Sequence, residues 1–600
     1  MLTPRRIAVV LPLLIAGLAR AAPPAKPAAG KPPPDPDPHV AAAVQAVDSN
    51  ALPAFAASVE SELTPALNDL AALDLNRITT LASFREFGRY FGRVDAPQPA
   101  QRETLKWLAA QPRLLPVLMT SVSDADAPAD VLAVLSALRQ DSADRLDEYA
   151  DLTAAVCVVW DAAPVRAANR PVRGAGGAPA TQPAAARKAD PAAAVKRFRY
   201  YADPKAGLRC DFKTLPCQIA IYAVDTAVAD DEITWAARNY GNRRQLSRVY
   251  FEVPYDRAAF HAGARQADAL PYTLPNIRQY GGVCLDQAYF AANVGKALGQ
   301  PAAVCVGQSG SQGELHAWIG YLQPAGKFAA WNFYEGRYGD MMFWSGQVID
   351  PQGGPPATDA DVCLLAELTA SPAANRLAST ALCKSRDLVD DRRAPELYMR
   401  AIDLSPGNRP AWMALAQLGA DRKLTIPEID RVTEVLHRFA VERYPDFAFA
   451  VFRRIIAGRS VDEQLVAIAN LARLFAVRPD LVATVRVAQG DLLRDANRSK
   501  EALAAYTDAM ADAQRTGPVL PQAMDRADGL LRASGEKVKL AALYQSVWSR
   551  TPPPQPSGYA EVTPFCVIGH RYAALLRDMG RAAEANAVEQ RVGRYEAGKT

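Results

Sequence analysis

Apolar residues recur every three or four positions along much of the chain, and this period predicts amphipathic helices. The pattern runs from residue 39 to residue 160 and is broken by Pro53 and Pro65. It returns after residue 358 and continues to the C-terminus. We therefore expect an N-terminal helical region over residues 39–160 and a C-terminal helical region over residues 359–600.

The stretch between these regions, residues 196–358, has a different pattern. Tyr, Phe and Trp become common there, and short apolar runs replace the helical period. Such runs predict strands, here over residues 248–256, 301–308, 316–322 and, with its following turn, 327–340. This middle part is expected to be α+β, and a chain of 600 residues is too long for one core. The expected fold class is therefore multidomain α+β.

Small and aromatic residues in the C-terminal region recur at the spacing of a helical repeat. They stand at Ala394, Tyr398, Ala401 and Pro406, again at Gly490, Ala502, Tyr506 and Ala509, and more weakly at Ala573, Gly580 and Ala585. Small residues let two antiparallel helices approach closely, and the aromatic residue fills the space between units. These positions resemble the tetratricopeptide repeat. An ordinary α-helical bundle is the alternative.

The N-terminal segment and the segments that connect these regions differ from them in composition. MLTPRR, an apolar run and the small residues of Ala19–Arg20–Ala21 are typical of a signal peptide over residues 1–21. An uncleaved membrane anchor is the alternative, but the apolar run is shorter than the roughly 20 residues that span a bilayer. Residues 22–38 are a Pro/Ala-rich tether, and residues 161–195 are a low-complexity linker or surface insertion.

These features predict a mature protein that is exported to the periplasm or the extracellular space. The abundance of Ala, Arg and Pro is typical of a bacterium with a GC-rich genome. The net charge is +4 with no dense Lys/Arg run, which argues against nucleic acid and against a membrane as partners after signal cleavage. The sequence has no phosphate-binding Walker loop and neither a Cys-x-x-Cys nor a His-Glu-x-x-His motif. We expect no cofactor and no metal.

Export permits disulfides, and the chain has eight cysteines. Cys210 and Cys217 are close in sequence and form the best candidate pair. Cys363 and Cys383 form the second. Sequence alone does not determine the connectivity.

Cys284 differs from the other cysteines in its surroundings. It follows Gly281 and Gly282, and the next residues have a helical pattern that ends near Gly299 and Pro301. Cys284 is therefore expected at the N-terminus of a helix. The helix dipole and free backbone N–H groups should lower the pKa of its thiol there, and the N–H groups could hold an oxyanion.

A nucleophilic thiol needs a base, and His316 is the best placed of the five histidines. It opens an apparent strand 32 residues after Cys284, and Asn332 follows it by 16 residues. A hairpin through residues 323–326 would bring both side chains to one end of the sheet. Asn332 could then orient the imidazole.

GGVCLDQAYFAA, LGQPAAVCVG, HAWIGYL and a Trp-bearing strand together resemble the transglutaminase-like superfamily, over about residues 275–345. The resemblance implies a papain-type core, in which a cysteine helix packs against an antiparallel sheet. It implies that Cys284 is the nucleophile and His316 the base. The third residue of the family triad is usually Asp, whereas this chain offers Asn332. Asp350 and Asp340 are the alternatives for that role.

These patterns predict an exported thiol acyl-transfer enzyme that acts on amide or peptide bonds of protein or cell-wall substrates through a thioester. The C-terminal region could bind a protein partner. The alternative is a catalytically inactive scaffold with the same core, whose function is partner binding by the tetratricopeptide-like region.

Overall fold

The structure is a computed structural model. It describes residues 37–164, 188–246, 248–256, 270–308, 315–325, 328–337, 346–439, 443–476, 479–513, 519–554 and 563–596. The predicted signal peptide, nearly all of the tether and the centre of the predicted linker lie outside these residues. Within them, no helix combines the length and the apolar character needed to cross a membrane.

The N-terminal region is helical, as predicted. Its helices are α1 (Pro38–Asp48), α2 (Leu52–Ala66), α3 (Leu75–Phe91), α4 (Pro99–Ala109), α5 (Leu114–Ser121), α6 (Pro128–Leu146) and α7 (Ala150–Trp160). Pro53 and Pro65 do not separate helices, because both lie inside α2. Pro53 is in the first turn, where a missing N–H breaks no intrahelical hydrogen bond.

The predicted linker ends earlier than expected. α8 (Pro191–Ala202) begins inside it, because Asp190 accepts a hydrogen bond from the Ala193 amide at 2.9 Å and Pro191 occupies the first turn. Ala163 N–H donates to the Lys188 carbonyl at 3.1 Å, so the two described ends of this segment lie side by side. The segment is therefore an insertion between adjacent elements.

A five-stranded antiparallel sheet lies in the middle of the molecule, with strand order β3-β2-β1-β4-β5. The strands are β1 (Ala302–Gln308), β2 (Leu315–Ala325), β3 (Phe328–Asn332), β4 (Gln347–Val348) and β5 (Ala357–Thr358). The predicted strands at residues 301–308, 316–322 and the start of 327–340 are confirmed. The strand predicted at residues 248–256 is wrong.

The segment 248–256 contains a short 3-10 helix, η3 (Tyr250–Glu252). Its Tyr250 amide donates to a side-chain oxygen of Glu335 at 3.0 Å. Tyr255 forms an isolated bridge with Gly282, which is not part of a strand. Of the residues that predicted a strand, Val249, Tyr250 and Val253 fill the core beside the sheet, whereas Phe251 and Tyr255 are exposed.

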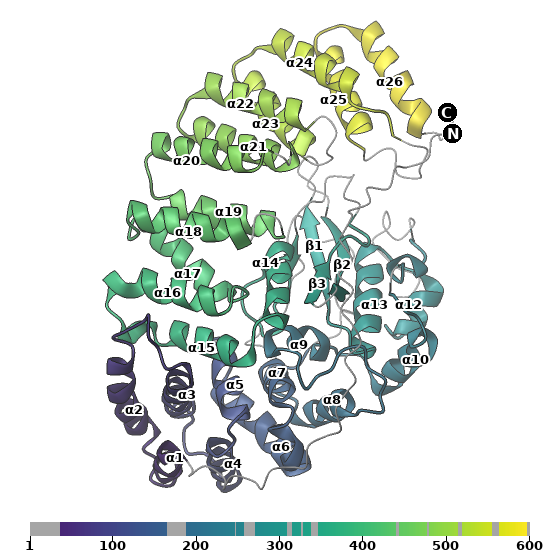
Figure 1. Ribbon diagram of the computed structural model, residues 1–600. Coiled ribbons are helices and arrows are strands. Elements are labelled where there is room, and N and C mark those ends of the chain that lie inside the picture. Colours follow the sequence, from purple (N-terminus) through teal and green to yellow (C-terminus); the bar gives the residue numbers. More distant parts are fainter. Residues whose placement is uncertain are drawn as a thin grey trace, which may run out of the picture.

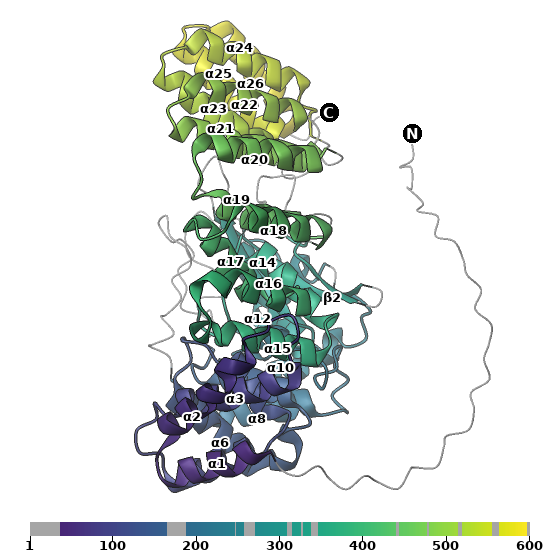
Figure 2. The ribbon, with the colours of Figure 1, turned by 60° about the vertical axis from the view of Figure 1, so that its left-hand side comes forward.

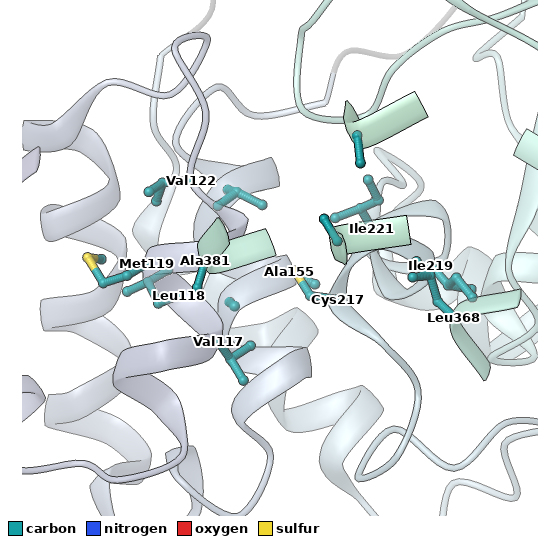
Figure 3. Close-up of a cluster of buried hydrophobic side chains, with 14 of the residues drawn as sticks. Val117, Leu118, Met119, Val122, Ala155, Cys217, Ile219, Ile221, Leu368 and Ala381 are labelled. Carbon is teal, nitrogen blue, oxygen red and sulfur yellow. The ribbon is translucent and has the colours of Figure 1, made fainter. Parts of the chain in front are cut away.

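The two faces of the sheet pack against different helices. Ala317, Ile319 and Tyr321 share a core with α10 (Asp230–Tyr240), α12 (Leu274–Tyr280) and α13 (Cys284–Ala297). Trp318 and Leu322 alternate with them and join the opposite core. That core continues through α9 (Cys217–Val224) to α5 and α7, and Figure 3 shows part of it around Cys217.

The C-terminal region is helical as well, and Figures 1 and 2 show its helices stacked in a curved array. They are α14 (Asp359–Leu364), η6 (Leu365–Thr369), α15 (Ala373–Lys384), η7 (Arg386–Leu388), η8 (Asp391–Arg393), α16 (Ala394–Leu404), α17 (Arg409–Ala420), α18 (Ile426–Phe439), α19 (Pro445–Ile456), α20 (Val461–Leu474), α21 (Pro479–Asp495), α22 (Ser499–Asp512), α23 (Val519–Ala533), α24 (Lys537–Arg550), α25 (Pro564–Asp578) and α26 (Ala582–Glu596). A Cβ atom on Gly490 would collide with the ring of Tyr506, which confirms that this small residue allows two helices to approach.

The helical regions at the two ends of the chain are in contact. α15 packs beside α3 (Figure 1), where Arg85 donates to the Lys384 carbonyl at 3.1 Å and forms an ion pair with Asp387. Lys384 donates to the Val122 carbonyl at 2.7 Å. One apolar core therefore extends from the N-terminal helices through one sheet face into the array, and a separate core fills α21–α26.

Candidate functional site

Cys284 is the first residue of α13, and close backbone contacts fix this helix start. Gly282 N–H donates to the Pro254 carbonyl at 3.0 Å, and Asp256 N–H donates to the Gly282 carbonyl at 2.9 Å. Gly281 has a φ of 78°, and a Cβ atom there would collide with the Pro254 carbonyl oxygen. Gly281 is thus required because another segment passes directly against it, whereas a Cβ atom on Gly282 would collide with the Asp286 side chain.

Two buried side chains of α13 hold the same end of the helix. Asp286 accepts hydrogen bonds from the Val283 amide at 2.8 Å and from the Tyr272 hydroxyl at 2.7 Å. Gln287 donates to the Val253 carbonyl at 2.8 Å. The carboxylate of Asp286 caps the helix, and Gln287 ties it to the segment before Pro254. Cys284 is therefore held in a defined position.

The thiol of Cys284 has the N–H donors that the sequence predicted but not the low pKa. The backbone N–H groups of Ala317, Leu285 and Cys284 itself lower its pKa. Burial acts in the opposite direction, is the largest cause, and raises the pKa of the Cys284 thiol to about 11. The expectation of a lowered pKa is therefore corrected: desolvation of the thiolate outweighs the helix start.

His316 lies near the start of β2, on the sheet face that carries Trp318. Its ring stacks with that of Trp318 at a centroid distance of 6.0 Å, and its Nε2 is 2.5 Å from the Gly336 carbonyl oxygen. A carbonyl only accepts, so Nε2 carries the proton and Nδ1 is the basic nitrogen of the neutral ring. Burial lowers the pKa of His316 to about 4. At neutral pH the imidazole is uncharged.

The structure brings the cysteine helix and the histidine strand together at one peptide bond. The Ala317 N–H that faces the Cys284 thiol belongs to the peptide bond between His316 and Ala317. The two side chains on either side of that bond point to opposite faces of the sheet. Ala317 lies in the core beside α13, and His316 lies on the other face. Among the described residues, the largest causes of the shift in the thiol pKa do not include His316.

Asn332 is not at the same end of the sheet as His316. It pairs with Tyr321, five residues along β2, which is about 17 Å at about 3.4 Å per residue. Its amide donates to Gln323 at 3.3 Å and accepts from the Tyr334 N–H at 3.0 Å. The hairpin predicted through residues 323–326 is shifted, because pairing continues to Ala325 and Phe328. The register therefore carries Asn332 away from the imidazole.

Of the two alternative third residues, Asp350 lies among the described residues. Asp350 accepts a hydrogen bond from the Gln352 amide at 3.0 Å, and burial raises the pKa of its carboxyl. Asp340 lies outside the described residues. The carbonyl of Gly336 binds the imidazole. Sequence reasoning missed it because a backbone carbonyl has no signature in the residue type, and only the strand register could have indicated it.

The predicted disulfide between Cys210 and Cys217 is absent, which is a correction. Both are free thiols, as are Cys363 and Cys383. Cys217 begins α9 and points into the core near Ala155 (Figure 3), where burial raises the pKa of its thiol. Burial also raises the pKa of the half-buried Cys210 to about 11. Closeness in sequence did not place the two sulfur atoms in one environment.

The sequence matches no protein-family model, and none of the curated proteins compared with it matches either. Among the described residues, no group of three or more His, Cys, Asp or Glu side chains is arranged to hold a metal ion. The case for a function therefore rests on the contact between the start of α13 and the start of β2.

Proposed function

We propose that this chain is an exported, transglutaminase-like thiol acyl-transfer enzyme with a papain-type core, acting on amide or peptide bonds of protein or cell-wall substrates. The supporting observation is the position of Cys284, at the first residue of α13 and against the peptide bond that follows His316. Thiol acyl transfer uses a cysteine that is activated by a nearby base, and a cysteine at a helix start against a histidine-bearing strand supports that arrangement.

The proposed reaction uses the tautomer that the Gly336 carbonyl selects. Cys284 Sγ attacks the carbonyl carbon of an amide, and its proton passes to Nδ1 of His316. The carbon–nitrogen bond breaks as Nδ1 returns that proton to the leaving amine, and a thioester remains on Cys284. Nδ1 then takes a proton from water or a second amine as it attacks the thioester; the carbon–sulfur bond breaks and the proton returns to Cys284 Sγ, which gives hydrolysis or transamidation. Throughout, Nε2 donates to the Gly336 carbonyl and fixes the ring.

Cys284 and His316 are both uncharged before the reaction begins. With a thiol pKa of about 11 and an imidazole pKa of about 4, both groups are neutral at pH 7. The proton therefore moves during the attack, with His316 as general base, and a stored thiolate–imidazolium pair is not formed beforehand.

Turnover of casein with a labelled primary amine tests the proposal. Cys284→Ala should abolish both amine incorporation and peptide release. Cys210→Ala is the matched control, because that thiol is also half-buried with a pKa of about 11. Turnover that persists in Cys284→Ala would contradict the proposal. The ratio of incorporation to release then separates transamidation from hydrolysis.

The pH dependence of alkylation tests the neutral pair. In the protein without substrate, the rate of Cys284 modification by iodoacetamide should rise about tenfold per pH unit from pH 7 to pH 10, because only the thiolate reacts. Peptide mapping of the labelled site provides the measurement. A rate that is already constant near pH 7 would show a stored ion pair instead.

A non-catalytic scaffold is the second candidate, and one observation favours it. The imidazole lies on the sheet face opposite to α13, and its pKa is low. In this case the tetratricopeptide-like array would bind a protein partner, and the core would only support it. Partner capture that is equal for wild type and Cys284→Ala, with no turnover in either, would establish this function.

A further inference from the structure

Tyr250 contacts both halves of the candidate site. It lies in η3 and is fully buried, at 0% exposure. Its hydroxyl donates to the Ala317 carbonyl at 2.9 Å. Ala317 is the residue whose N–H faces the Cys284 thiol. The hydroxyl thus holds Ala317 from its carbonyl side while its amide is directed at the sulfur.

The ring of Tyr250 contacts the group that orients the histidine. Gly336 has a φ of 74°, and a Cβ atom on it would lie 2.7 Å from the ring carbon Cζ. The ring therefore packs directly on Gly336, whose carbonyl binds His316 Nε2. No residue with a side chain could occupy position 336 without moving either the ring or the backbone.

The backbone of Tyr250 makes the third contact. Its N–H donates to the Glu335 carboxylate at 3.0 Å, and the Glu335 carbonyl accepts from the Ile319 N–H at 3.3 Å. Burial raises the pKa of Glu335, whose side chain is half-buried. The turn that carries Gly336 is in this way attached to both β2 and η3.

We propose that Tyr250 is a positioning residue of the thiol acyl-transfer site, with a separate task for each part of its side chain. Its hydroxyl fixes the amide donor of the Cys284 thiol, and its ring fixes the carbonyl acceptor of His316. This inference rests on the proposed function for its catalytic consequence. The geometry that it describes does not depend on turnover.

The two parts of the side chain can be removed one at a time. Tyr250→Phe keeps the ring and removes the hydroxyl, so it should affect the thiol alone. Alkylation of Cys284 should require a higher pH, with a rate at pH 9 about threefold lower, because the Ala317 N–H stabilises the thiolate less well. The ¹⁵N NMR signals of His316 should still show one tautomer, with the proton on Nε2.

Tyr250→Leu removes the ring as well, so it should affect both groups. The His316 signals should then show a mixture of tautomers, and kcat should fall about tenfold further than in Tyr250→Phe with KM unchanged. Thermal unfolding of each variant provides a check on folding. If Tyr250→Leu does not fold, Tyr250→Phe decides through alkylation alone.

Tyr321→Phe is the matched control. The Tyr321 hydroxyl also donates to a backbone carbonyl at 2.9 Å, that of Ala291. Tyr321 is 1% exposed and lies on β2, the strand that carries Ala317. It should change neither alkylation nor the tautomer. Equal alkylation shifts in Tyr250→Phe and Tyr321→Phe, or none in Tyr250→Phe, would overturn the inference. Alkylation of Cys284 and the tautomer of His316 are both measured without substrate. They therefore remain decisive if Cys284→Ala shows that the proposed function is wrong.

Discussion

The candidate site and helices α21–α26 of the C-terminal array both contain buried tyrosines that donate hydrogen bonds, but the acceptors differ in charge. In the array, the Tyr506 hydroxyl donates to the Asp491 carboxylate at 2.9 Å, and Arg526 donates to the same carboxylate at 2.7 Å. At the site, Tyr250 and His316 donate to backbone carbonyls instead. The acceptors of these tyrosines and arginines in the array are carboxylates, whereas the acceptors of Tyr250 and His316 are neutral carbonyls.

The array repeats its arrangement one helix pair later. The Tyr544 hydroxyl donates to the Asp528 carboxylate at 2.5 Å, and Arg532 forms an ion pair with that carboxylate. Each carboxylate has two or more partners, so the loss of one leaves the others. At the site, the Gly336 carbonyl binds the imidazole and the Trp318 ring stacks on it. We therefore expect substitutions to have small, shared effects in the array and large, specific effects at the site, where the side chains carry the proposed chemistry.

The largest effect is expected from His316→Gln. Glutamine can still donate to the Gly336 carbonyl, but it cannot accept a proton from the thiol. Turnover should therefore fall about 10²- to 10⁴-fold while the fold is kept. Steady-state kinetics and thermal unfolding provide the two measurements.

His570→Gln is the control for this comparison. His570 bridges Glu589 at 2.9 Å and Glu596 at 2.7 Å, and these carboxylates raise the pKa of its imidazole although partial burial opposes them. A histidine with a raised pKa contributes stability below its unfolded pKa and loses it as the pH rises through its folded pKa. His570→Gln should thus lower stability at pH 5 more than at pH 9 and leave turnover intact. Equal turnover losses for both histidines would contradict the assignment of His316.

A smaller effect is expected from Tyr506→Phe. The substitution removes one of the hydrogen bonds to Asp491, which keeps its ion pairs with Arg526 and Arg494. The free energy of unfolding should fall by about 1 kcal/mol, the usual contribution of one hydrogen bond. Denaturant unfolding measures it. A loss above about 3 kcal/mol would mean that the remaining partners of Asp491 do not compensate for the missing hydrogen bond.

The helical regions, three strands and the start of α13 could be predicted because local patterns determine them. The apolar period marks the helices, and the glycine pair with the following helical run marks Cys284. The partner of His316 could not be predicted, because it depends on strand register. A shift of the turn from residues 323–326 to the positions after Ala325 moves every cross-strand neighbour.

The ionisation states at the site could not be predicted from the sequence either. A helix start predicts a low thiol pKa, but the protein that surrounds Cys284 reverses the sign. Burial comes from elements distant in the chain, and no local pattern reports it. Tyr250 was missed for a related reason: its segment has strand-like composition, and only its contacts with Ala317 and Gly336 reveal what the ring and hydroxyl do.

The smallest effect is expected from Asn332→Ala, and it tests the register directly. If Asn332 oriented His316, its loss would cost turnover as other orienting residues do. Because Asn332 pairs with Tyr321 and its amide binds Gln323 and Tyr334, turnover should stay within about twofold of wild type. Unfolding should reveal a loss of about 1 kcal/mol from the missing hydrogen bonds. A hundredfold loss of turnover with an intact fold would restore Asn332 as the partner of His316 and would require a hairpin register different from the one observed.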